Sequence, residues 1–72
     1  MKYYVAELSN KNSYAKAEVI EAKSLTSAKR IASRNQVFYG TVMEIGYDVN
    51  EDGFILKPIA QKIDGKWIDL EA

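Results

Sequence analysis

Any chemistry in this sequence has to use carboxylates, amines and hydroxyls, because its 72 residues include neither cysteine nor histidine. That absence excludes disulfides, thiolate nucleophiles, histidine bases and Cys/His zinc sites. Asp48, Glu51 and Asp52 resemble part of a calcium loop, but their spacing does not match one. No serine has a base at motif spacing, and the four scattered glycines form no phosphate-binding loop. We therefore predict a protein that is not an enzyme, uses no metal, cofactor or small-molecule substrate, and acts by binding another macromolecule.

The basic residues Lys29, Arg30 and Arg34 are concentrated on one predicted helix, where Arg30 and Arg34 are one turn apart. A guanidinium group bonds carboxylates and phosphates in a bidentate manner. Gln36, just beyond the helix, could add a directional hydrogen bond. These four residues are our candidates for contact with an acidic partner or with phosphates. The alternative, which the residues alone favour, is the solvated face of an amphipathic helix.

Tyrosine is also frequent, with five copies in this short chain. A single sheet with one helix cannot bury both of its faces, and exposed tyrosines provide a large contact area at little cost in entropy. The candidates for a protein interface are Tyr3, Tyr14, Tyr39 and Tyr47. The alternative for each of them is an ordinary half-buried strand aromatic.

In the N-terminal half, two strands and a helix are predicted to position these residues. Residues 2–9 alternate in the manner of a strand, a turn follows at 10–13, and a second strand over about 14–22 pairs with the first as a hairpin. Ser24 is a typical helix N-cap. The next three turns carry one apolar stripe made of Leu25, Ala28, Ile31 and Ala32.

In the C-terminal half, the pattern predicts three more strands. Residues 37–49 form a long strand with Gly46 as a bulge, and a turn follows at 50–53. Residues 54–63 form the next strand. Pro58 has no backbone N–H to donate to a neighbouring strand, so this strand must lie at an edge of the sheet or bulge at that position. Asp64-Gly65 is a type I′ hairpin signal before a last strand at 67–70. The predicted class is α+β, in the order ββαβββ, with a five-stranded antiparallel sheet and one helix packed on it.

Length and charge limit the possible functions further. The length fits one domain spanning residues 1–72. Ten basic and ten acidic residues cancel, which argues against both a polyanionic DNA mimic and a protein that grips DNA by bulk charge. No apolar run approaches the ~20 residues of a membrane span, and Glu7 interrupts any apolar signal core. We therefore expect a cytoplasmic protein without a membrane partner.

One segment of the sequence, residues 20–45, carries a specific pattern. The helix part of this pattern is common among small domains, but the pattern continues beyond the helix. A second, shorter part of it lies near the C-terminus, at Asp64-Gly65-Lys66-Trp67-Ile68-Asp69. The residues that carry it are Ile20-Glu21-Ala22, Ser24-Leu25, Ala28-Lys29-Arg30-Ile31-Ala32-Ser33, Gln36, Phe38, Gly40-Thr41-Val42-Met43 and Ile45. Together they resemble a phage anti-CRISPR family, the ninth named family of type I-F CRISPR inhibitors. The resemblance is absent around 46–60, where this chain has a longer hairpin.

The resemblance implies an inhibitor that acts in the cytoplasm of the bacterial host cell. Such a protein binds the backbone subunits of the type I-F surveillance complex and blocks pairing between guide RNA and target DNA. The family's contact residues correspond to Lys29, Arg30, Arg34 and Gln36, with Arg34 matching in charge only. Indirect contact with duplex DNA within the complex is also implied. Two alternatives stay open: a phage inhibitor of another host enzyme or defence protein, and a small nucleic-acid-binding module.

Overall fold

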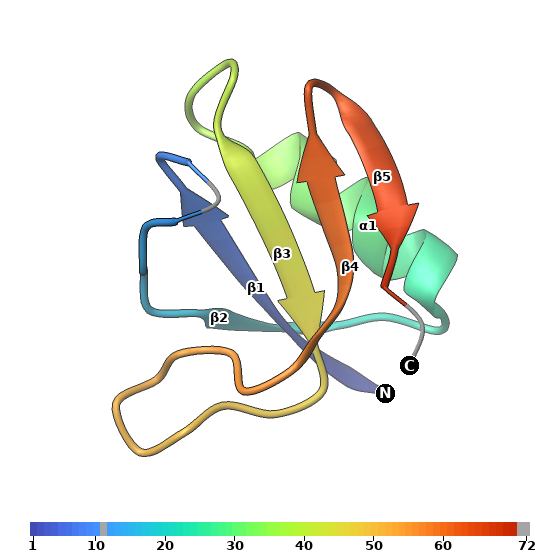
Figure 1. Cartoon of the computed structure of the whole chain (residues 1–72). Coiled ribbons are helices and arrows are strands. Elements are labelled where there is room, and N and C mark those ends of the chain that lie inside the picture. The colour runs from blue at the N-terminus through green and yellow to red at the C-terminus, as the bar shows by residue number, and fades with distance from the viewer. Residues whose placement is uncertain (11, 71–72) are drawn as a thin grey trace.

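The computed structural model describes residues 1–10 and 12–70, which form a five-stranded antiparallel sheet and one helix. Neighbouring strands follow the order β2-β1-β3-β4-β5, and α1 covers one face of the sheet (Figure 1). The predicted α+β class and ββαβββ order are confirmed. The elements are β1 (Lys2–Leu8), β2 (Glu18–Glu21), α1 (Leu25–Asn35), β3 (Val42–Gly46), β4 (Pro58–Ile63) and β5 (Lys66–Asp69).

The main core lies between α1 and the sheet. Ala28 and Ala32 are fully buried, so the predicted stripe of the helix faces the sheet. Their small side chains allow a close approach of the helix to the large side chains of Tyr3, Met43 and Ile45. A second, smaller cluster made of Ala6, Leu8 and Val42 lies apart from this core, with Ile55 and Ile63 packed against it.

Both ends of α1 have a local explanation. The Ser24 hydroxyl accepts a hydrogen bond from the Ser27 backbone N–H at 3.2 Å, which confirms the predicted N-cap. At the other end, Gln36 adopts an extended conformation, and its N–H donates to the Ser33 carbonyl at 3.4 Å. The helix therefore ends where the sequence pattern fades.

Three strands are shorter than predicted, because segments with strand-like composition leave the sheet. The second strand begins at Glu18 rather than at 14, since the Ala17 N–H bonds the Gly53 carbonyl at 2.8 Å instead of a neighbouring strand. The third occupies 42–46 rather than 37–49, and the fourth begins at Pro58 rather than at 54. The segments around β3 thus form two long connections, residues 36–41 and 47–57, at opposite ends of the strand (Figure 1).

The predicted irregularities at Gly46 and Pro58 are one feature. Pro58 pairs with Gly46, and the register between β3 and β4 shifts between Ile45 and Gly46. Because β4 lies between β3 and β5, Pro58 is accommodated by a bulge at the start of the strand and not by a sheet edge. A Cβ on Gly46 would lie 2.5 Å from Ile55 Cγ2, so this position requires a residue without a side chain.

Two turns behave as predicted. Asp64 and Gly65 have φ values of 52° and 79°, the positive angles of a type I′ hairpin between β4 and β5. In the turn predicted at 10–13, the Asn10 side chain accepts from the Asn12 N–H at 2.8 Å, and the Ser13 N–H donates to the Asn10 carbonyl at 3.1 Å. Lys11 lies outside the described residues.

Candidate partner-binding surface

Lys29 is tied to the sheet. Its Nζ forms an ion pair with Asp69 Oδ1 on β5 at 2.5 Å, and the lysine side chain is only 21% exposed. A cation already satisfied by a carboxylate has less to offer to a partner. The sequence grouped Lys29 with the two arginines, but the structure turns it toward β5.

Arg30 and Arg34, in contrast, are exposed and form no ion pair with any residue in the described ranges. They line a shallow depression of about 380 Å³ beside the chain that enters the helix. Lys23 lies in the same depression, while the nearby Glu21 is engaged by the N-terminal amine at 3.1 Å. Lys23 was not among the candidates from the sequence, because it precedes the N-cap Ser24 and helical periodicity therefore does not relate it to the arginines.

Gln36 makes its side-chain hydrogen bonds within the chain. Its Nε2 donates to the Thr41 hydroxyl at 2.9 Å and to the Thr41 carbonyl at 3.3 Å. Its Oε1 accepts from Lys62 Nζ on β4 at 2.9 Å. Gln36 therefore holds the connection 36–41 against the sheet. Of the four candidate residues, only Arg30 and Arg34 have no bonded side-chain partner among residues 1–10 and 12–70.

The connection 36–41 exposes three consecutive large apolar side chains that the prediction had placed in a strand. Val37 is 74% exposed, Phe38 68%, and Tyr39 is fully exposed. Gly40, at φ 89°, turns the chain back toward β3. We name residues 37–39 the apolar loop.

Glu7 on β1 holds the apolar loop in place. Its Oε1 accepts from the Val37 N–H, and its Oε2 accepts from the Phe38 N–H and the Thr41 hydroxyl, each at 2.8 Å. Partial burial acts to raise the pKa of Glu7, but these three hydrogen bonds outweigh it and hold the pKa below its usual value. A charged carboxylate thus orders a loop whose own side chains make few contacts.

The predicted tyrosine surface is partly wrong. Tyr3 is 1% exposed and belongs to the core under α1, because strand alternation places it on the helix side together with Val5. The centroid of its ring lies 5.5 Å from the centroid of the Tyr47 ring. Tyr14, Tyr39 and Tyr47 are exposed, but they lie on three different connections.

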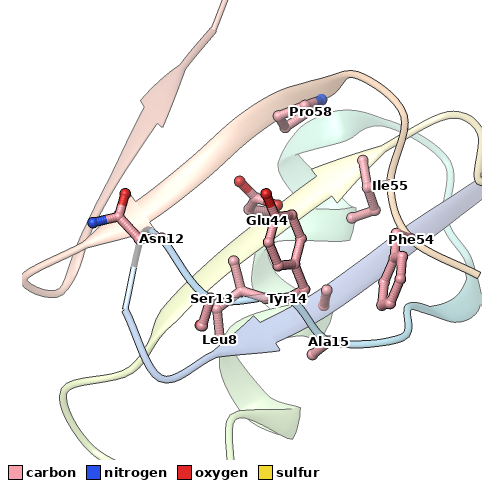
Figure 2. Close-up of a pocket in the computed structure, with 10 residues that line it drawn as sticks. Leu8, Asn12, Ser13, Tyr14, Ala15, Glu44, Phe54, Ile55 and Pro58 are labelled. Atoms are coloured by element: carbon pink, nitrogen blue, oxygen red, sulfur yellow. The ribbon is translucent and has the colours of Figure 1, made fainter.

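A hollow of about 410 Å³ lies over the smaller apolar cluster, between residues 12–15 and 54–58 (Figure 2). Glu44 of β3 lies in it, with Tyr14 and Phe54 at its margin. The sequence did not indicate this hollow, because its walls come from three separate parts of the chain.

The acidic residues that resemble part of a calcium loop, Asp48, Glu51 and Asp52, lie on the connection 47–57. No three acidic side chains in residues 1–10 and 12–70 are grouped so that they could hold a metal ion. The Asp48 carboxylate accepts from the Val49 N–H at 2.9 Å, as in an ordinary turn. Over the same residues, no helix has the length and apolar character needed to cross a membrane.

Comparison with known proteins gives a related solved structure. The chain matches no protein-family model and no curated protein. A solved structure named AcrIF9 is 42% identical to it and superposes with a TM-score of 0.78. The superposition covers 100% of this chain and 88% of the other, so it includes residues 46–60, where the sequence resemblance was absent. The chain therefore belongs to the AcrIF9 family of phage anti-CRISPR proteins, which are inhibitors and not enzymes.

Proposed function

We propose that this protein inhibits a type I-F CRISPR surveillance complex in the cytoplasm of the bacterial host cell. In this proposal it binds the backbone subunits that hold the guide RNA and prevents target DNA from pairing with the guide. Membership of the AcrIF9 family supports the choice of partner. The contact surface is supported by the geometry of α1 and the connection after it.

One observation carries the choice of surface: Arg30 and Arg34 lie on the last turns of α1, Arg34 is three residues before the apolar loop, and both groups are exposed. Interface centres are enriched in arginine and aromatic residues, and a few such residues supply most of the binding energy. Glu7 holds the loop backbone in advance, so less entropy is lost when Phe38 and Tyr39 bind. Arginine side chains can then form bidentate bonds with carboxylates of the partner.

Steric blocking is sufficient as a mechanism. Replacing a DNA duplex by a guide–target duplex is close to balanced in energy, so loss of a few pairing positions stops the process. A compact obstacle bound along the guide therefore does not need to cover all of it. The described residues measure 27 × 25 × 24 Å, which is enough to span several base-pair steps.

The direct test is co-purification of this protein with a type I-F complex, followed by measurement of target-DNA binding. We expect a stable complex that no longer captures its matched target. Absence of co-purification, together with normal target binding, would contradict the proposal.

The surface is tested with the double variant Arg30→Glu/Arg34→Glu. We expect its affinity for the complex to fall at least about 100-fold, because two free cations become anions at the contact. Its matched control is Lys2→Glu/Lys66→Glu, which changes the charge equally at two exposed positions outside α1. Equal inhibition by the helix variant and wild type, with both folded, would reject this surface.

A further inference from the structure

The sheet face away from α1 is only partly covered. Its apolar cluster is flanked by residues 12–15 on one side and by the 47–57 hairpin on the other. The Ala17 N–H and Gly53 carbonyl, 2.8 Å apart, join these two walls. The hollow of about 410 Å³ between them is within the size range of binding pockets in proteins, about 300–1,000 Å³.

The hollow contains one acidic group. Glu44 projects from β3, and its Oε2 accepts from Gln61 Nε2 at 2.9 Å. That is the only hydrogen bond to its carboxylate from residues 1–10 and 12–70, and no lysine or arginine of those ranges lines the hollow. A half-buried carboxylate with a single neutral donor retains an unmet preference for a cation.

The margin of the hollow suits the same kind of ligand. The rings of Tyr14 and Phe54 pack with their centroids 5.9 Å apart at 53°, and Tyr14 remains 84% exposed. Aromatic faces attract cations, and lysine and arginine lay their aliphatic stems along apolar surface. Figure 2 shows Tyr14 and Glu44 in the same hollow, with Leu8 and Ile55 among the apolar side chains around them.

We propose that this hollow receives a lysine or arginine side chain from the protein partner. The proposal rests on the proposed function, because a channel that holds a guide–target duplex is positively charged and presents such side chains. The 47–57 hairpin beside the hollow carries three acidic residues, Asp48, Glu51 and Asp52, and one basic residue, Lys57. Its net charge is therefore negative and complementary to a basic surface. Because this face is opposite α1, the partner is held by two separate surfaces of the inhibitor.

The test compares the affinities of wild type and Glu44→Gln for purified type I-F complex. Glutamine keeps an oxygen that can accept from Gln61 but removes the charge, so the fold is retained. We expect binding to weaken at least about tenfold, as for loss of a charge-assisted hydrogen bond. The control Glu18→Gln removes the same charge at an exposed position of β2, outside the hollow and the hairpin, and leaves the affinity within about twofold of wild type.

A second variant, Tyr14→Ala, tests the aromatic margin, and we expect a weakening of about threefold or more, with thermal unfolding of the same sample to show that the chain remains folded without the Tyr14–Phe54 contact. Wild-type affinity in both Glu44→Gln and Tyr14→Ala overturns this inference and leaves the proposed function intact. Failure of wild type itself to bind overturns both. Sedimentation gives the remaining outcome: a wild-type dimer that Glu44→Gln dissociates would assign the hollow to a second copy of this chain and overturn the proposal.

Discussion

The two connections that flank β3 are both long and exposed, but they are ordered in different ways. Residues 36–41 depend on a side chain from elsewhere, since Glu7 of β1 accepts the hydrogen bonds of Val37 and Phe38. Residues 47–57 are ordered mainly from within. There the Asn50 side chain accepts from the N–H groups of Asp52 and Phe54, at 2.9 and 3.0 Å.

This difference decides where the apolar side chains go. In the hairpin, Ile55 packs on the sheet and Phe54 against Tyr14, so these two side chains contribute to folding, while Leu56 and Tyr47 are exposed. In the apolar loop the backbone is held by a carboxylate, so the side chains of Phe38 and Tyr39 are not needed for stability and remain exposed. A loop whose backbone is held by a side chain from another element can therefore keep its own aromatic groups available for a partner.

The largest effect is expected from Phe38→Ala/Tyr39→Ala. If the loop is a contact surface, affinity for the type I-F complex falls by roughly 100-fold or more, since exposed aromatics of this kind act as hot spots. The melting temperature should change little, because both side chains are exposed. Calorimetry of unfolding and a binding titration on the same samples separate the two effects. Unchanged affinity would place the contact elsewhere.

Next in size is Glu7→Gln, which removes the charge that orders the loop. We expect the free energy of unfolding to fall by about 1–3 kcal/mol, because three hydrogen bonds to a charged acceptor are weakened. Urea denaturation at pH 7 measures this change. Glu51→Gln, with the same charge change at an exposed position, is the matched control and should stay within about 0.5 kcal/mol of wild type.

The same carboxylate predicts a pH dependence. The pKa of Glu7 is lower in the folded chain than in the unfolded one, so its stabilisation is complete above the unfolded value, about 4.5, and is lost as the pH falls through the folded value. Stability curves of wild type and Glu7→Gln should therefore converge at acidic pH. Parallel curves down to pH 2 would show that the charge of Glu7 does not order the loop.

At the base of the hairpin, Gly46→Ala should destabilise the protein by about 1–2 kcal/mol. The new Cβ would lie 2.5 Å from Ile55 Cγ2 and 3.2 Å from the Lys57 carbonyl oxygen, so the hairpin has to move. Thermal unfolding measures the loss, and amide shifts of residues 54–57 should report the movement. A stability equal to wild type would mean that the hairpin is not fitted to the bulge.

The smallest effect is expected at the corresponding glycine of the other connection. Gly40→Ala meets no atom within 4 Å, so only its positive φ of 89° opposes a side chain. The expected loss is about 1 kcal/mol. Urea denaturation of Gly40→Ala and Gly46→Ala under the same conditions separates the cost of backbone strain from the cost of close packing. A larger loss of unfolding free energy in Gly40→Ala than in Gly46→Ala would reverse the order predicted for the two connections.

Much of the fold was predictable because its signals are local. The Ser24 cap, the stripe through Ala28 and Ala32 and the Asp64-Gly65 turn each depend on a few neighbouring residues. The errors occurred where strand-like residues leave the sheet. Val37 and Phe38 suit a strand, but Glu7, 30 residues earlier, accepts the hydrogen bonds that a neighbouring strand would have taken.

The candidate surface was predictable only in part, for the same reason. Helical periodicity placed Arg30 and Arg34 on the outside, and they are there. It also grouped Lys29 with them, but Asp69, 40 residues away, draws that lysine to β5. Gln36 is likewise engaged by Lys62 across the sheet. A pattern along one helix contains no information about which distant side chain meets it.

By itself the sequence determined the class of the fold, the order of its elements, the position of the helix and its turns, and the absence of thiol and imidazole chemistry. These properties depend on composition and on interactions within a few residues. Only the tertiary structure decided which charges remain free, which aromatic groups stay exposed, and that a hollow forms around Glu44. Those outcomes depend on strand register and on contacts between residues 30 or 40 positions apart, which the folded backbone alone brings together.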